Sequence, residues 1–189
     1  MYIEKASPAD APRAMEIIDL CRRHMRAGGS EQWNDFYPRI EIVQEDADTG
    51  SLYILRDGDA DIGAICLNEA QPPEYETLSW RYTTGPVLVI HRLCVRPDCQ
   101  AKGAARRLMD FAEAFARQER YHAIRLDTYT GNPRALALYD RRRYERVGQT
   151  VLGARRLPVI VFEKRVSMSS CSYAASSEQK PGTGADCPA

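Results

Sequence analysis

The run from Val87 to Leu108, VLVIHRLCVRPDCQAKGAARRL, constrains the fold of this chain more than any other part of the sequence. Residues 87–95 are apolar apart from His91 and Arg92, which is typical of a central strand covered on both faces. A proline stops the strand, and a turn containing Gly103 leads directly into a helix. Because the first N–H groups of a helix lack partners and carry the positive end of its dipole, this junction predicts an anion site.

The turn from Gln100 to Ala105 favours a diphosphate as the anion. Gly103 has no Cβ to keep a ligand from the backbone, and Lys102, Arg106 and Arg107 add positive charge beside it. A nucleotide-binding P-loop would need Gly-Lys followed by Ser or Thr, and a dinucleotide fold would need three glycines near the first strand. Neither pattern is present, and a tight strand-to-helix turn without a ligand explains the short motif equally well.

Strands and helices alternate in the second half of the chain, which predicts an α/β fold with a parallel or mixed sheet. Residue patterns predict strands at 2–5, 51–56, 61–68, 87–95, 123–129, 145–151 and 159–164. Pro72-Pro73 and Gly85-Pro86 predict a linker or long loops between the third and fourth of these strands. Capping residues and helical spacing predict four helices. The first follows Ser7, the second and third span 40–47 and 104–118, and the fourth begins after the cap Asn132. We expect one domain over residues 1–166 and a flexible Ser/Gly/Pro-rich tail over 167–189, since the tail has little to bury.

Two motifs in this order resemble those of the GNAT superfamily of acetyl-CoA-dependent N-acetyltransferases. Gln100, Gly103 and Ala105 match its Gln/Arg-x-x-Gly-x-Gly/Ala signature, and the segment NPRALALYDRRRY is similar to its Asn-x-x-Ala-x-x-x-Tyr helix. The resemblance extends over roughly residues 1–165 and leaves the subfamily unresolved. It implies a mixed, mostly antiparallel sheet of about seven strands, splayed at the fourth and fifth and flanked by about four helices.

The resemblance also implies how acetyl-CoA is held. The backbone at the end of the central strand would pair with the pantetheine arm, the turn would hold the pyrophosphate, and the basic side chains would lie near the adenosine phosphates. Asn132 matches a position that commonly contacts the cofactor, although Asn before Pro is also an ordinary helix cap. The predicted cofactor-binding residues are Leu93, Cys94, Val95, Gln100, Ala101, Lys102, Gly103, Ala104, Ala105, Arg106, Asn132 and Tyr139.

Two residues are candidates for proton transfer. Tyr139 matches the tyrosine that in many relatives protonates the departing thiolate, and core packing is the alternative role for it. His91 is a candidate general base because its ring titrates near neutral pH, and a buried structural histidine fits the sequence equally well. The arylalkylamine acetyltransferases have a histidine at the same offset. Asp127, Glu69 and Glu31 are weaker alternatives for the base, because solvated or paired carboxylates fit these positions better. Cys94 is disfavoured as a nucleophile, because cysteine in an apolar strand usually packs.

The acceptor pocket is defined least by the sequence. In the family it is shaped by the loop after the first helix and by the final hairpin, here with Arg155 and Arg156. We therefore expect Glu31, Trp33, Tyr37 and Asp127 to contact a cationic amine, whereas loop aromatics can also simply cover a core. One position departs from the family pattern: Arg143 stands where relatives usually have the glycine before an aromatic residue. We expect that turn to be strained or different.

Composition limits the remaining possibilities. Lys plus Arg and Asp plus Glu number 26 each, so no bulk charge favours nucleic acid or a membrane as a partner. No signal sequence or spanning segment is evident, and the six cysteines match no CxxC or zinc spacing. Together with the resemblance to the GNAT superfamily, these limits lead us to expect a cytoplasmic enzyme, monomer or homodimer. The resemblance implies that it transfers acetyl from acetyl-CoA to a small-molecule or peptide amine by direct attack, without a metal. The alternative is a non-catalytic acyl-CoA-binding or regulatory module on the same fold.

Overall fold

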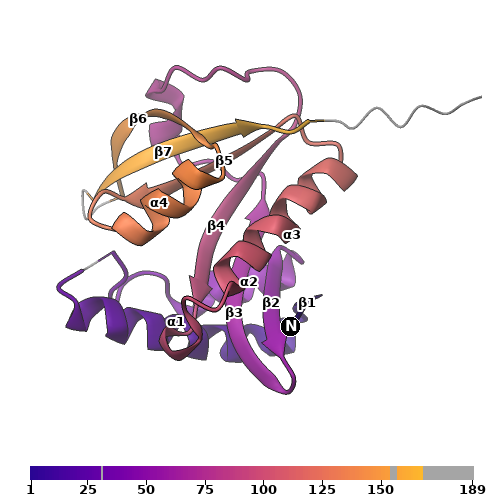
Figure 1. Cartoon of the computed structure of the whole chain (residues 1–189), viewed down its shortest axis with the longest axis vertical. Coiled ribbons are helices and arrows are strands. Elements are labelled where there is room, and N and C mark those ends of the chain that lie inside the picture. The colour runs from indigo at the N-terminus through magenta and orange to yellow at the C-terminus, as the bar shows by residue number, and fades with distance from the viewer. Residues whose placement is uncertain (31, 154–156, 168–189) are drawn as a thin grey trace, which may run out of the picture.

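The computed structural model describes residues 1–30, 32–153 and 157–167. Seven strands form one sheet in the order β1-β2-β3-β4-β5-β7-β6, as Figure 1 shows. The strands are β1 (Tyr2–Lys5), β2 (Leu52–Asp57), β3 (Ala60–Asn68), β4 (Val87–Val95), β5 (Ala123–Tyr129), β6 (Glu145–Leu152) and β7 (Leu157–Arg165). The α-helices are α1 (Ala11–Ala27), α2 (Ile40–Asp48), α3 (Ala104–Gln118) and α4 (Pro133–Arg141), with short 3-10 turns η1 (Pro8–Asp10), η2 (Pro73–Thr77) and η3 (Pro97–Cys99).

Every neighbouring pair of strands is antiparallel except β4 and β5. The exception follows from α3, which returns the chain across one face of the sheet so that β5 can run alongside β4. This mixed seven-strand sheet with four α-helices confirms the predicted fold class. The predicted strands 2–5, 87–95 and 123–129 and the predicted helix 104–118 have the bounds of β1, β4, β5 and α3. The predicted helix after Asn132 starts where α4 does, and the remaining predicted elements differ by one to three residues at one end or both.

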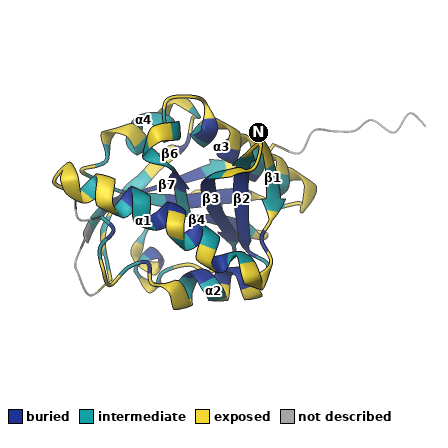
Figure 2. Cartoon of the chain, turned by 90° about the horizontal axis from the view of Figure 1, so that it is seen from below, coloured by how far each residue is buried: buried dark blue, intermediate teal, exposed yellow. Residues whose placement is uncertain are grey.

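Helices cover both faces of the sheet. On α1 the buried residues Ala14, Ile17, Ile18 and Cys21 recur at helical spacing and pack on one face, together with residues of α2. On α3 the buried stripe packs on the opposite face, in a core that includes Tyr139 of α4. Figure 2 shows the buried strands behind α1, whose outer side is exposed. None of the described helices is long and apolar enough to cross a membrane.

A third apolar cluster lies under residues 69–86, which we predicted as loops. Tyr75 of η2 is 1% exposed and packs on Val159 and Val161 of β7, next to Leu78 and Trp80. These two β7 residues alternate with Phe162, which belongs to the core on the α4 side. The segment therefore covers the face of the C-terminal half of the sheet that α4 leaves open.

Arg143 adopts a left-handed conformation, with φ of 60°. It lies directly after α4, where the N–H of Tyr144 donates to the carbonyl of Tyr139 and closes the helix end. The expectation of strain at this position is therefore met by the backbone angle, because an L-residue is disfavoured there. The predicted tail lies outside the described residues apart from Ser167, as do Arg155 and Arg156.

Candidate functional site

The central feature of the site is a split in the sheet between β4 and β5. The two strands pair only where Val87–Val89 face Ala123–Arg125, although β4 continues to Val95 and β5 to Tyr129. Figure 1 shows the strands diverging beyond these pairs. We call this unpaired region, residues 90–95 of β4 and 126–129 of β5, the split. Its strand edges carry backbone groups that have no partner across it.

A β-bulge lies in β4 at the split. Ala64 of β3 faces Cys94, but Cys66 faces His91, so that Ile65 alone opposes both Arg92 and Leu93. Arg92 accommodates the extra residue by adopting a φ of 50°, which is uncommon for a residue other than glycine. The bulge takes the backbone of residues 92 and 93 out of the regular ladder beside the split.

The Arg92 side chain is held by a buried ion pair. Its Nε and one terminal nitrogen donate to the two carboxylate oxygens of Asp46 on α2, at 2.6 and 2.5 Å, and its other terminal nitrogen lies 3.3 Å from the Tyr37 hydroxyl. The two charged side chains are 10% and 7% exposed. Our sequence reasoning missed Asp46, although it shares the buried helical stripe of Val43 and Ala47. The pair anchors the bulge to α2.

The predicted turn from Gln100 to Ala105 adopts an unusual backbone. Ala101 and Gly103 have φ of 62° and 85°, and α3 begins at Ala104. The Gln100 side chain is fully engaged: its Nε2 donates to the Val95 carbonyl at 3.1 Å, and its Oε1 accepts from Arg134 of α4 at 2.8 Å. Gln100 therefore fixes the end of β4 relative to the start of α4.

Six consecutive N–H groups at this turn, those of residues 101–106, have no acceptor among the described residues. An ordinary helix start accounts for four of them, and the left-handed turn adds the other two. A Cβ built on Gly103 meets no atom within 4 Å, so the space beside these groups is open. Lys102, Gly103 and Arg106 also line a hollow of about 490 Å³. The arrangement suits a multivalent anion such as a diphosphate.

Tyr139 lies on α4, 6% exposed. Its ring packs against Phe162 and Tyr144, with centroids 5.5 and 6.0 Å away. Its hydroxyl has no hydrogen-bond partner among the described residues. Burial, and then the charge of Asp127, raise the pKa of Tyr139 above the usual range, so the phenol is protonated at neutral pH. A protonated, unpartnered hydroxyl of this kind can donate a proton.

His91 lies on β4 at the start of the split and is half-buried. Its Nε2 is 3.0 Å from the Ala70 carbonyl, and because a carbonyl only accepts, Nε2 carries the proton and Nδ1 is the basic atom. Burial, followed by the charge of Arg92, lowers the pKa of His91 to about 4. The ring is therefore neutral at pH 7 and only weakly basic.

Asn132 caps α4, as its sequence context predicts. Its Oδ1 accepts from the N–H of Ala135 at 3.1 Å, and its Nδ2 donates to Oε1 of Gln32 at 3.0 Å. Gln32 belongs to the loop between α1 and α2, 100 residues away. We did not predict Gln32, and no local pattern in the sequence indicates it. The bond links that loop to the N-terminus of α4.

Of the predicted acceptor residues, Trp33 is 7% exposed and packs in the core beneath α1. Tyr37 is half-buried and approaches Arg92. Asp127 accepts a hydrogen bond from the Tyr75 hydroxyl at 2.8 Å. Glu31 lies outside the described residues. Tyr37 and Asp127 are thus tied to groups beside the split, whereas Trp33 packs in the core.

Cys94 is 6% exposed and has Cys21 of α1 beside it. The hydrogen bond with Cys21, together with burial, raises the pKa of the Cys94 thiol well above its usual range. A thiol in this state is a poor nucleophile. The geometry therefore agrees with packing as the role of its side chain.

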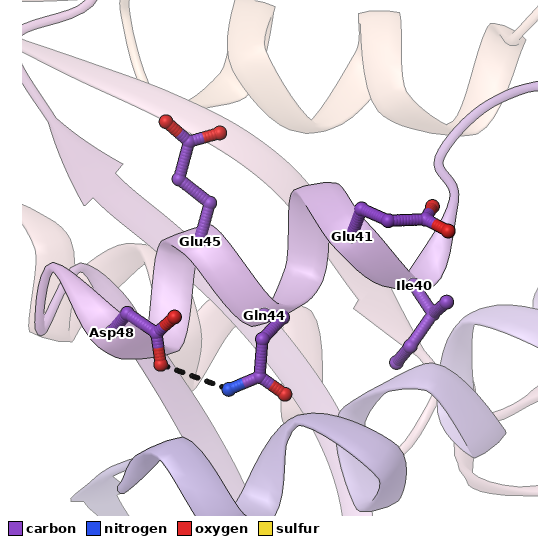
Figure 3. Close-up of a pocket in the computed structure, with 5 residues that line it drawn as sticks. All are labelled: Ile40, Glu41, Gln44, Glu45 and Asp48. Atoms are coloured by element: carbon purple, nitrogen blue, oxygen red, sulfur yellow. Dashed lines mark hydrogen bonds between the residues drawn. The ribbon is translucent and has the colours of Figure 1, made fainter.

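A second hollow, of about 380 Å³, lies along the outer side of α2, away from these residues. Figure 3 shows its lining, which comes entirely from that helix. Gln44 there donates to Asp48 at 2.9 Å. No group of three potential metal ligands occurs among the described residues. The hollow is lined by Ile40, Glu41, Gln44, Glu45 and Asp48.

Comparisons with known proteins agree with this geometry. A family model described as the acetyltransferase (GNAT) family matches residues 14–144. A GNAT-family acetyltransferase from Streptococcus agalactiae has a TM-score of 0.75 at 18% identity, over 87% of this chain and 94% of that one. A putative acetyltransferase from Staphylococcus aureus Mu50 has a TM-score of 0.69 at 21% identity, over 88% of this chain and 100% of that one. A putative acetyltransferase from Salmonella typhimurium, solved with its cofactor acetyl-CoA, has a TM-score of 0.66 at 17% identity, over 92% of this chain and 98% of that one. None of the curated proteins matches the chain.

Proposed function

Since the chain belongs to the acetyltransferase (GNAT) family, we propose that it transfers an acetyl group from acetyl-CoA to a primary amine of a small molecule or peptide. The observation that carries this proposal is the pairing of two features at the split. Six N–H groups without an acceptor among the described residues lie at the start of α3, beyond the end of β4. The Tyr139 hydroxyl, which also has no partner in that part of the chain, lies on α4. The first suits the diphosphate of CoA and the second suits its leaving thiolate.

Acetyl-CoA would bind along the β4 side of the split. The N–H groups of residues 101–106 would hold the diphosphate, with Lys102 and Arg106 beside it, and the backbone of residues 93–95 would pair with the pantetheine arm like an added strand. The open space beside Gly103 accommodates such a ligand. The structural neighbour from Salmonella typhimurium, which was solved with acetyl-CoA, supports this assignment of the cofactor.

The reaction would be a direct attack of the amine on the thioester. Holding both reactants in the split supplies proximity, and N–H groups near the β4 bulge would stabilise the carbonyl oxygen as it gains charge. Tyr139 would donate its proton to the sulfur as the C–S bond breaks. Burial and the charge of Asp127 raise the pKa of Tyr139, so the phenol carries its proton at neutral pH, although the same rise makes it a weaker acid than an exposed tyrosine.

Asn132 would contact the cofactor only by sharing or exchanging a bond it already makes, because both polar atoms of its amide are engaged. Its bond to Gln32 would then respond to cofactor binding. Tyr37 comes from the loop after α1, and the acceptor would approach along that loop. These assignments follow the family resemblance and the placement of Tyr37 beside Arg92.

The test is release of CoA from acetyl-CoA with a panel of primary amines, for the wild type and for Tyr139→Phe. We expect kcat to fall about 100-fold or more, as is usual when a general acid is removed, while the affinity for acetyl-CoA is unchanged. Tyr144→Phe is the matched control, since it removes a buried hydroxyl that has no partner. Tight acetyl-CoA binding without turnover for any amine would instead identify a non-catalytic binding module.

A further inference from the structure

Asp127 lies in the part of β5 that borders the split. It is the first residue there that faces away from α4. Arg125 is the last β5 residue paired with β4, and Leu126 points into the core shared with α4, so Asp127 projects from the opposite face. There it meets η2, where the Tyr75 hydroxyl donates to its Oδ2 at 2.8 Å. Its other carboxylate oxygen, Oδ1, has no hydrogen-bond partner among the described residues.

The titratable groups that act on Asp127 are Tyr75 and Glu74, both of η2, and Asp127 in turn acts on Tyr139 of α4. The charge of Asp127 raises the pKa of both Tyr75 and Tyr139, which places the carboxylate within electrostatic reach of the free hydroxyl of Tyr139. Burial raises the pKa of Asp127 itself, and the hydrogen bond from Tyr75 opposes that rise. A carboxylate with one fixed and one free oxygen thus lies within electrostatic reach of the predicted acid.

His91, the base predicted from sequence, is less suited to the same task. Its Nε2 is committed to the Ala70 carbonyl, and its pKa of about 4 follows from burial and the adjacent Arg92. The carboxylate of Asp127 would also attract a positive ammonium group, whereas a neutral imidazole would not. Charge and hydrogen bonding therefore both favour the carboxylate over the imidazole as the receiver of a cationic amine.

We propose that Asp127, held by Tyr75, binds the ammonium group of the acceptor through Oδ1 and takes its proton. This inference rests on the proposed function and names the acceptor class, a cationic alkyl amine. The nitrogen lone pair then forms the bond to the thioester carbon, the C–S bond breaks, and Tyr139 protonates the sulfur. Asp127 returns its proton to the Tyr139 oxygen directly or through a bridging water, and the second nitrogen proton leaves to solvent.

The experiment compares the pH dependence of kcat/KM for the wild type and Asp127→Asn, using the best acceptor of the amine panel. At pH 7 we expect a loss of about 100-fold or more, as for other general bases. The variant should regain about tenfold in rate per pH unit as the amine deprotonates in solution. Glu76→Gln, an exposed carboxyl-to-amide change in the same η2 turn, is the matched control and should retain the wild-type profile.

Tyr75→Phe provides a second readout that does not require removal of the carboxylate. The bond from Tyr75 favours the charged form of Asp127, so its loss should raise the pKa of Asp127 and move the acid limb of the profile to higher pH. A loss of activity in Asp127→Asn that is uniform across pH, or no loss, would overturn the inference while leaving the proposed function intact. Failure of the wild type to acetylate any amine would instead refute the proposed function.

Discussion

Gly103 allows the anion site to be tested apart from protein stability. In the variant Gly103→Ala the backbone φ of 85° places a side chain in the left-handed region, which costs about 1–2 kcal/mol. The added methyl also restricts the unfolded chain, which offsets about 0.4–1 kcal/mol. No atom lies within 4 Å of the new Cβ, so steric overlap adds nothing. We expect a net loss of about 1 kcal/mol and a fall in Tm of about 3 °C.

The effect on acetyl-CoA should be larger than the effect on stability. Gly103 lies among the six unpartnered N–H groups, and its methyl would occupy the open space where the diphosphate is proposed to bind. Losing one charge-assisted hydrogen bond costs about 1.5–3 kcal/mol. We therefore expect Kd for acetyl-CoA, measured by calorimetric titration, to rise about 10- to 100-fold.

Gly29→Ala is the matched control. Gly29 follows α1 with φ of 78°, and its Cβ would likewise meet nothing within 4 Å, so the strain is the same and the anion site is absent. Both variants should lose similar stability, and only Gly103→Ala should lose affinity. Equal values of Kd in the two variants would refute the assignment of the turn as the diphosphate site.

Two further predictions concern stability. Arg143→Gly removes the strain of a left-handed residue, which stabilises the fold by about 1–2 kcal/mol, and gives the unfolded chain more freedom, which offsets about 0.4–1 kcal/mol. We therefore expect Tm in a thermal melt to rise by about 2 °C. A fall in Tm would show that the arginine side chain compensates for the strain. Asp46→Asn leaves the buried charge of Arg92 without its partner, so urea unfolding should show a loss of about 3 kcal/mol. The exposed Glu45→Gln on the same helix should change it by less than about 0.5 kcal/mol, and equal losses would contradict the role of the buried pair.

Local patterns were sufficient to predict most of the elements. The apolar run of β4, the stripe of α3 and the cap at Asn132 are each decided by residues within one strand or helix turn. The turn at Gly103 was recognisable for the same reason, because a helix start exposes its N–H groups whatever surrounds it. What the turn binds depended on the second motif, which ends at Tyr139.

Contacts between distant residues could not be predicted in this way. Tyr75 meets Asp127 across 52 positions and Arg92 meets Asp46 across 46, and neither pairing leaves a local trace. Segment 69–86 looked like linker because its prolines and polar residues suit a loop, yet one fully buried tyrosine orders it against β7. The low pKa of His91, which makes it a weak base, likewise arises mainly because folding buries its ring, and only secondarily from the charge of Arg92.

The split in the sheet also bears on aggregation. Strand edges with unpaired backbone groups are templates for pairing with other chains, and here two such edges lie inside the sheet instead of at its margins, where β1 and β6 stand. The backbone of β4 suited to bind a cofactor is thus a hazard whenever none is bound. The bond between Gln32 and Asn132 ties the loop after α1 to the start of α4, three residues beyond the end of the β5 edge.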